Sequence, residues 1–311
     1  MEKLGILNLA ACMATACLVL AAGCSEPDET ATKGYIRVAS AEVAFPYIEK
    51  SAQKFELTYN EAFVDVGRTT SREALVDLAE GRSRMAVMSR EPNETEIAAL
   101  STGERQFVTR TVAHDALVVI LHGDNPVDEL TVGQLKDIYT GKITNWREAG
   151  GRDVLIRPLV RDRNSGTYEV FQDRVLGDSE YGAGVYPCST MAVLTGLAGS
   201  HPGAIGITGL LMTTHAQTMG YYKIIRVAEE EGGQYILPTQ NKILEEPNKA
   251  HKKLYPLRRP FVLCYFKSSS FDVNLVSGFV TFLTAVKGQQ LAIDGGIVPA
   301  TMPVRVVKLT E

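Results

Sequence analysis

Short apolar runs alternate with helix-like segments along almost the whole chain, and no other feature constrains its fold as strongly. The runs have the length and composition of buried strands, and they occupy residues 35–40, 85–89, 116–122, 154–160, 204–208 and 261–266. Between them, apolar residues recur at helical steps, as in 45–59, or a capping pattern marks a helix start. Such patterns occur at Thr70–Glu73, Asn93–Glu96 and Thr131–Gln134. The last long helix is expected over about 271–286. Strands that alternate with helices form mostly parallel sheets, so we predict an α/β fold.

Composition excludes several other classes of protein. Of the 311 residues, 45% are hydrophobic and 22% charged, which is typical of globular proteins and not of disordered chains, coiled coils or fibres. The 32 Lys and Arg residues against 36 Asp and Glu give a net charge of −4, which does not favour nucleic-acid binding. Five cysteines are too few for a disulfide scaffold; Cys188 and Cys264 lie among apolar neighbours and either pair or remain buried thiols. No CxxC or HxxxH spacing indicates a metal site, and we expect no metal and no cofactor.

The first residues have the features of an export signal. Residues 4–22 are apolar and almost uncharged, and Ala21–Cys24 resembles a bacterial lipobox, in which signal peptidase cuts before a cysteine that becomes lipidated. The same stretch is just long enough for a transmembrane anchor, which is the alternative. We predict a signal peptide over 1–23, followed by lipidated Cys24 and a flexible tether over 24–33. In either case the rest of the chain is exported and faces the periplasm or the cell exterior.

The segment from Arg161 to Thr167 carries the clearest chemical signal. It reads RDRNSGT and follows a predicted strand, so Ser165, Gly166 and Thr167 open the next helix. A helix N-terminus has unpaired N–H groups and a partial positive charge, both of which attract an anion. The hydroxyls add donors, the glycine lets the backbone come close, and Arg161 brings a planar fork of N–H groups. From spacing alone, Ser165 could equally be a plain helix cap and Arg161 a solvated charge.

Four segments together resemble a known family. They are RDRNSGTYEVF, the run 115–146 containing IYTGKITNW, PGAIGIT at 202–208, and GQQLAIDGGIVP at 288–299. They are similar to the phosphate-binding proteins of bacterial phosphate ABC transporters, and the resemblance covers about residues 34–300. It implies a type II periplasmic-binding fold, with two α/β lobes, two crossover strands and a ligand cleft. The lobes would comprise residues 34–113 with 260–311, and residues 114–259.

The resemblance also implies which residues bind the ligand. Arg161 matches the family's phosphate-clamping arginine, and Ser165, Gly166 and Thr167 match its helix-terminal donors. The matching positions of the other lobe are the backbone of Phe45 and the side chains of Thr70, Ser71, Ser89 and Arg90.

Two departures from the family pattern bear on selectivity. Ala44 stands where the family has a threonine, so only backbone N–H groups remain there. Ser89–Arg90 stands where some members have Ser-Asp and others Ser-Arg, and a carboxylate at that place can accept the proton of hydrogen phosphate. Sulfate has no proton to give, so the arginine weakens the case for phosphate over sulfate. Replacement acceptors could be Glu42, Glu73, Asp115 or Asp162.

The resemblance implies a lipid-anchored substrate-binding protein that captures inorganic phosphate for an ABC importer. Its partners would be phosphate, the permease subunits and, through Cys24, the membrane; we expect a monomer and no nucleic acid. His114, Asp115 and Ser165 suggest a hydrolase, but no GxSxG motif occurs, so we expect no enzyme. The alternatives are a receptor for another tetrahedral oxyanion such as sulfate, or a non-transporting sensing or assembly lipoprotein with a degenerate cleft.

Overall fold

A computed structural model of the chain describes residues 29–102, 105–213, 222–243, 254–267 and 273–301. The predicted signal peptide, Cys24 and residues 25–28 of the predicted tether lie outside these residues. Within the described ranges, no helix is long and apolar enough to cross a bilayer.

A continuous mixed sheet runs through the molecule in the strand order β2-β1-β3-β11-β4-β8-β6-β7. These strands are β2 (Glu61–Thr69), β1 (Lys33–Ala41), β3 (Met85–Met88), β11 (Arg258–Lys267), β4 (Gln106–His122), β8 (Ala204–Gly209), β6 (Arg157–Arg161) and β7 (Tyr186–Cys188). Two short strands, β9 (Tyr222–Ile224) and β12 (Val298–Pro299), also pair with β4. A separate small sheet pairs β5 (Glu129–Thr131) with β10 (Arg226–Ala228).

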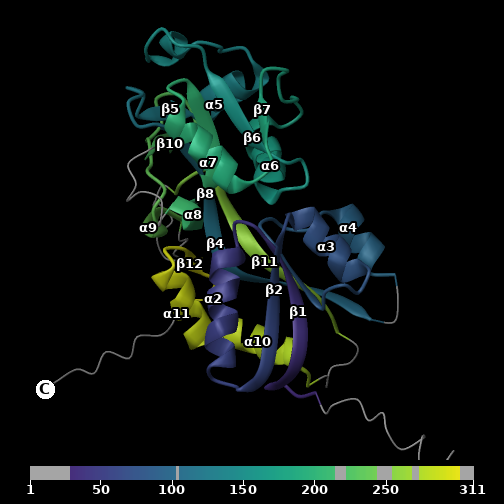
Figure 1. The fold of residues 1–311 in the computed structure, drawn as a ribbon. Coiled ribbons are helices and arrows are strands. Elements are labelled where there is room, and N and C mark those ends of the chain that lie inside the picture. The colour runs from purple at the N-terminus through teal and green to yellow at the C-terminus, as the bar shows by residue number, and fades with distance from the viewer. Residues whose placement is uncertain (1–28, 103–104, 214–221, 244–253, 268–272, 302–311) are drawn as a thin grey trace, which may run out of the picture.

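The molecule has two lobes, which lie one above the other in Figure 1. We call the part around β1, β2 and β3 the first lobe and the part around β6, β7 and β8 the second lobe. The helices of the first lobe are α2 (Phe45–Glu56), α3 (Ser71–Ala79), α4 (Glu94–Leu100), α10 (Leu275–Thr284) and α11 (Val286–Asp294). The remaining helices are α5 (Val132–Thr140), α6 (Gly166–Phe171), α7 (Met191–Ser200), α8 (Leu210–Thr213) and α9 (Gln240–Ile243), with a 3₁₀ turn at Trp146–Ala149 and a π-helical turn at Gln172–Leu176.

Helix starts follow the capping chemistry that the sequence predicts. Capping boxes centred on Thr70, Asn93 and Thr131 begin α3, α4 and α5. Each box satisfies N–H groups that have no partner inside the helix. At its other end, α5 stops at Gly141, whose φ of 85° is left-handed and favours glycine.

Strands β4 and β11 belong to both lobes. One half of β4 pairs with β11 and the other half with β8, in both cases antiparallel. The expectation of mostly parallel pairing holds within each lobe, where β1 pairs with β2 and β3, and β6 with β7 and β8, all parallel. It fails at the junction, because a chain that enters the second lobe along β4 and returns along β11 must reverse its direction. The predicted α/β two-lobe fold class is confirmed, while the exact residue limits of the lobes stay a prediction.

The sheet of the first lobe is covered on both faces. Met85 and Val87 of β3 pack into the large core cluster that includes residues of α2 and α10, whereas Ala86 and Met88 pack with α3. Successive side chains of a strand point to opposite faces. This explains why the run 85–88 is apolar at every position instead of alternating.

The predicted helix over 271–286 is shorter in the structure and is followed at once by a second helix. Ala285 is extended, with φ −82° and ψ 171°, and separates α10 from α11. Gly288 permits the sharp corner, because a Cβ there would lie 2.4 Å from the carbonyl oxygen of Phe282. Residues 268–272, which include the predicted start, lie outside the described residues.

Candidate anion-binding site

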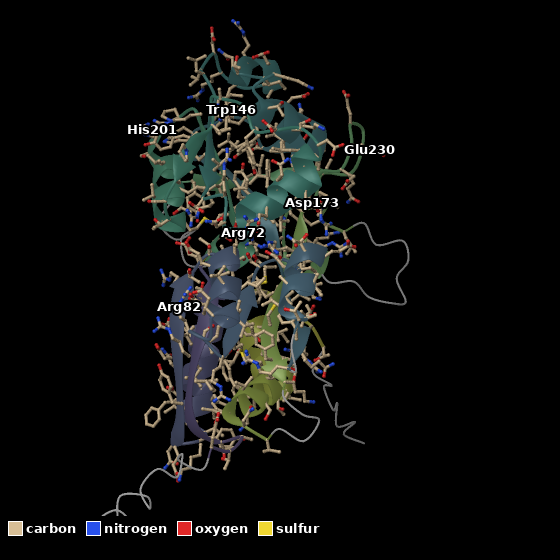
Figure 2. The ribbon with its side chains drawn as sticks, turned by 90° about the vertical axis from the view of Figure 1, so that its right-hand side faces the viewer. Arg72, Arg82, Trp146, Asp173, His201 and Glu230 are labelled. Carbon is tan, nitrogen blue, oxygen red and sulfur yellow. The ribbon has the colours of Figure 1, made fainter. Side chains whose placement is uncertain are left out.

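A small polar pocket lies where the two lobes meet. Its lining residues are Ala41, Glu42, Val43, Thr69, Thr70, Ser71 and Ser89 of the first lobe and Arg161, Ser165, Gly166, Thr167 and Met191 of the second. Its free volume is about 10 Å³. Arg72, labelled at the junction of the lobes in Figure 2, follows Ser71 directly and marks the level of the pocket. The predicted site residues therefore come together here, with the exception of Phe45 and Arg90.

Four strand ends supply the frame of this pocket. Ala41 ends β1, Thr69 ends β2, Ser89 follows β3, and Arg161 ends β6. Ala41 and Thr69 are directly paired in the sheet register, so they lie at the same level. Ligands of open α/β sheets bind beyond the carboxyl ends of the strands. Here both lobes turn such ends toward each other.

Two helices begin at the pocket, one from each lobe. Thr70 caps α3, and Ser165 caps α6, which continues through the π-helical turn to Leu176. Gly166 allows the two lobes to approach, because a Cβ at this position would lie 2.3 Å from Ser89 Oγ and 2.6 Å from Ser71 Oγ. A larger residue would fill the pocket or hold the lobes apart.

Serine hydroxyls in the pocket already accept hydrogen bonds, which leaves their own protons to donate. Ser71 Oγ accepts from the Ser89 N–H at 3.1 Å, and Ser165 Oγ accepts from the Tyr168 N–H at 3.2 Å. The Ser71 and Ser89 hydroxyl oxygens lie 3.2 Å apart. A hydroxyl has one proton, so Ser165 can donate to an anion, and Ser71 can do so when the Ser89 hydroxyl is the donor in their contact.

Thr70 differs from these serines. Its hydroxyl accepts from the Glu73 N–H at 3.2 Å and donates to Glu73 Oε2 at 3.0 Å. Thr70 lines the pocket, but its proton is committed to the capping box. Glu73 also accepts from the Thr69 hydroxyl, and this bond and those from Thr70 hold the pKa of the Glu73 carboxyl below its ordinary value.

A buried ion pair supports the Thr167 hydroxyl. Arg259 Nη1 donates to Thr167 Oγ1 at 2.9 Å, while Arg259 Nε and Nη2 donate to Asp115 Oδ2 at 2.9 and 2.7 Å. Both charged side chains are fully buried. Asp115 lies on β4 and Arg259 on β11. The two shared strands are therefore connected to the pocket through the hydrogen bond from Arg259 to Thr167. The remaining Asp115 oxygen accepts the Leu211 N–H at 3.1 Å.

Arg161 is held in the pocket by hydrogen bonds from two of its three guanidinium nitrogens. The residue is 5% exposed; its Nη2 donates to Glu42 Oε2 at 2.8 Å and its Nη1 to the carbonyl oxygen of Cys188. Its Nε is buried and has no hydrogen-bond partner among the described residues. A buried donor without a partner is costly, so this N–H indicates a place for an acceptor that the chain does not supply.

Arg90 lies outside the pocket lining. Its guanidinium donates to both carboxylate oxygens of Glu96 at 2.7 Å and to Glu169 of α6, and Arg72 donates to the same Glu169 at 2.6 Å. Burial alone would lower the pKa of Arg90, but the hydrogen bonds to Glu96 and Glu169 raise it above its ordinary value. Two arginines of the first lobe therefore hold one carboxylate of the second lobe.

Phe45 also lies outside the lining. Its side chain is buried, and the Arg68 guanidinium carbon lies 4.2 Å from the ring centroid. Of the four candidate proton acceptors, Glu42 alone lines the pocket. Asp162 accepts the Asn164 N–H at 2.8 Å, next to the start of α6.

Cys188 and Cys264 are free and buried in the structure. Burial raises the pKa of both thiols above the ordinary value. Of the two alternatives, the structure therefore shows buried thiols and not a disulfide between Cys188 and Cys264.

Sequence reasoning missed two contributors to the site. Arg259 ends the basic sequence run 251–259, and such runs usually form a solvated face, yet its side chain is fully buried. Its position directly before an apolar strand, with Asp115 on the other crossover segment, is the sequence signal that could have indicated a buried ion pair. Met191 was also missed, because it contributes a backbone N–H, which any residue has.

The fold and the pocket define a class of protein. Two α/β lobes joined by two shared strands, with a small polar pocket between them, form a periplasmic-binding-protein-like receptor for a small solute. The chain belongs to the PBP superfamily, since the model of the PBP superfamily domain matches residues 25–287.

Relatives of known name agree with this assignment. A phosphate-binding protein PstS of Staphylococcus aureus (strain MRSA252) is 24% identical over 271 residues, which cover 86% of this chain and 79% of the relative. A phosphate-binding protein PstS of Staphylococcus epidermidis is 24% identical over 269 residues, with the same coverage. The resemblance to the phosphate-binding family is thereby confirmed.

Solved structures show the same fold. A protein of Clostridium perfringens, described as a phosphate ABC transporter substrate-binding protein and solved with bound phosphate, has a TM-score of 0.72 and 24% identity, covering 86% of this chain and 100% of that chain. An ABC-type phosphate transport receptor of Vibrio cholerae has a TM-score of 0.64 and 24% identity, with the same coverage. These likenesses confirm the type II periplasmic-binding fold.

Proposed function

We propose that this chain is a substrate-binding protein that holds inorganic phosphate in the pocket between its lobes and delivers it to an ABC importer. One observation carries the proposal: among the described residues, the buried Nε–H of Arg161 has no hydrogen-bond partner, and it lies in a pocket rich in hydroxyl groups. The names of the relatives and of the solved structures support phosphate as the ligand.

The donors suit a tetrahedral oxyanion. Arg161, Ser71, Ser165 and Thr167 each bring a donor to the pocket lining, and the start of α6 adds the N–H groups near Gly166. Hydrogen bonds to a charged group contribute about 1.5–3 kcal/mol each. At the middle of that range, four or five of them exceed the roughly 8 kcal/mol of a micromolar complex, and the surplus offsets desolvation and ordering. No nucleophile or base has a role in this scheme, so we propose a binding protein and not an enzyme.

The pocket opens for the ligand to enter. A free volume of about 10 Å³ is close to that of one water molecule, and phosphate is larger. Side chains or lobes must therefore move, and β4 and β11 are the segments through which the lobes can turn. A hinge of this kind lets the permease distinguish the loaded, closed form from the empty one.

The chain is proposed to be exported and anchored by lipid on Cys24. The lipobox-like Ala21–Cys24 and the tether composition support this. Labelling cells with a radioactive fatty acid tests it: the wild-type chain should incorporate label, and Cys24→Ser should not. Equal labelling of both would overturn the anchor and leave the phosphate site untouched.

Calorimetry tests the function itself. The chain from residue 25 is unfolded and refolded to remove bound anion, then titrated with phosphate and, separately, with sulfate. Saturable phosphate binding near micromolar affinity without a sulfate signal is the expected result. Equal binding of both anions would make the chain a general oxyanion receptor. No binding of either would refute the proposal and favour a non-transporting lipoprotein.

A further inference from the structure

The carboxylate of Glu42 lies in the pocket itself. Glu42 follows β1 of the first lobe, and its Oε2 accepts a hydrogen bond from Arg161 Nη2 of the second lobe at 2.8 Å. The Arg161 side chain is 4% exposed and that of Glu42 is 14% exposed. The ion pair therefore spans the two lobes in a place sheltered from water.

The same carboxylate also takes a backbone donor. The Met191 N–H donates to both oxygens of Glu42, at 3.0 and 3.1 Å. Met191 is the first residue of α7 (Met191–Ser200), whose N-terminus carries a partial positive charge. Glu42 thus engages a guanidinium and a helix N-terminus, which are the donors that an oxyanion prefers.

Space in the pocket is limited by this arrangement. With Glu42 in place, the free volume is about 10 Å³, while the Arg161 Nε has no partner in the part of the chain that the structure describes. A ligand that reaches Nε and the serine hydroxyls must share Arg161 with a carboxylate of the same sign of charge. Like charges a few ångströms apart repel strongly in a site sheltered from water.

We propose that Glu42 is a tethered anion that occupies part of the empty oxyanion site and must leave Arg161 when the ligand binds. This inference rests on the proposed function of the pocket and names the residue that sets its affinity. If Glu42 is engaged in nine of ten empty molecules, the apparent dissociation constant rises about tenfold, because only the remaining fraction is ready to bind. The protein is therefore half-saturated at a higher ligand concentration than its hydrogen-bond donors alone would require.

Two substitutions at Glu42 distinguish the effect of the space that its side chain fills from the effect of its negative charge. Glu42→Thr removes the carboxylate from the pocket, and Glu42→Gln keeps its size but removes its charge. Glu49→Gln is the matched control, since Glu49 is an exposed residue of α2 outside the pocket lining. Thermal unfolding of each variant establishes that it is folded.

The refolded chain from residue 25 and its variants are titrated with phosphate and with sulfate. We expect Glu42→Thr to lower the phosphate dissociation constant at least about tenfold, Glu42→Gln to lower it less, and Glu49→Gln to leave it unchanged. Any sulfate affinity should improve by the same factor as phosphate, because a tethered anion competes with both.

Other outcomes overturn the inference in distinguishable ways. If the folded Glu42→Thr variant binds phosphate as the wild type does, or more weakly, Glu42 is no competitor, while the proposed function stands. A loss for phosphate together with a gain for sulfate would make Glu42 a proton acceptor instead. If neither the wild type nor a variant binds either anion, the proposed function itself fails, and the inference with it.

Discussion

Arg259 donates a hydrogen bond to the Thr167 hydroxyl at 2.9 Å, and so connects a strand shared by both lobes to the pocket between them. The bond occupies the acceptor side of Thr167 and directs its proton elsewhere. Arg259 is in turn neutralised by Asp115 on the other shared strand. The position of one pocket hydroxyl therefore depends on the two strands about which the lobes can turn.

Thr167→Val should weaken phosphate binding about 10- to 100-fold, because it removes a donor to a charged ligand that is worth about 1.5–3 kcal/mol. Calorimetric titration measures the change. Thr167→Ser keeps the hydroxyl and should stay within a few-fold of the wild type. Wild-type affinity in the valine variant would exclude Thr167 from the set of ligand donors.

Gly166→Ala should reduce phosphate affinity by more than about 100-fold. The added methyl group would meet Ser89 Oγ and Ser71 Oγ at 2.3 and 2.6 Å, so the pocket is filled or the lobes stay apart. Gly196→Ala is a suitable control, since a Cβ at this position of α7 meets no atom within 4 Å. That variant should keep its affinity and gain about 0.5–1 kcal/mol of stability. Equal affinity of both variants would show that Gly166 does not face the ligand.

Glu169→Gln should speed the release of phosphate several-fold. Glu169 of α6 is held by Arg72 and Arg90 of the other lobe, so its charge stabilises this arrangement of the two lobes. Stopped-flow measurements at low and high salt check this, and the difference from the wild type should shrink as salt screens the pairs. Asp173→Asn, on the following turn with a side chain that is 84% exposed, should change little. Unaltered release from Glu169→Gln at low salt would mean that these ion pairs do not hold the lobes together.

The local signals of the sequence predict local structure well. Thr70, Asn93 and Thr131 begin helices as expected, since a cap and its partner lie three residues apart. The pocket residues Ser165 and Gly166 were predictable for the same reason, because a strand end, a cap and a glycine are adjacent in the chain.

Charge pairing across the fold could not be predicted in this way. The family resemblance placed Arg90 among the ligand donors, yet its guanidinium is satisfied by Glu96 and Glu169. Arg259 and Asp115 are 144 residues apart and meet only because β4 and β11 are paired. No periodicity or motif encodes such a meeting, since it depends on how the lobes are assembled.

Both thiols should resist modification in the folded chain. Cys188 and Cys264 are buried, and burial raises the pKa of each, so little thiolate is present at pH 8. Ellman's reagent should react with them only in urea. Fast reaction of either in the native chain would contradict the burial described here.

Alkaline pH should reduce stability through the same groups. Below the ordinary thiol pKa of about 8.5 both states are protonated, and above it only the unfolded chain loses its thiol protons readily. The free energy of unfolding should therefore fall as pH rises from about 8 to 10. Urea unfolding at several pH values checks this. Cys264→Ala should make the free energy of unfolding depend less on pH. An identical slope in that variant would mean that other groups cause the pH dependence.

Asp115→Asn should destabilise the chain by about 3–5 kcal/mol, because it leaves the Arg259 guanidinium fully buried beside a neutral amide. Urea unfolding measures this loss, and phosphate titration of the folded fraction should show weaker binding, since Thr167 loses its fixed neighbour. Asp153→Asn breaks an exposed pair with Arg147 and should cost less than about 1 kcal/mol without affecting binding. If Asp115→Asn lost stability but bound phosphate as tightly as the wild type, the ion pair would support the fold alone and not the pocket.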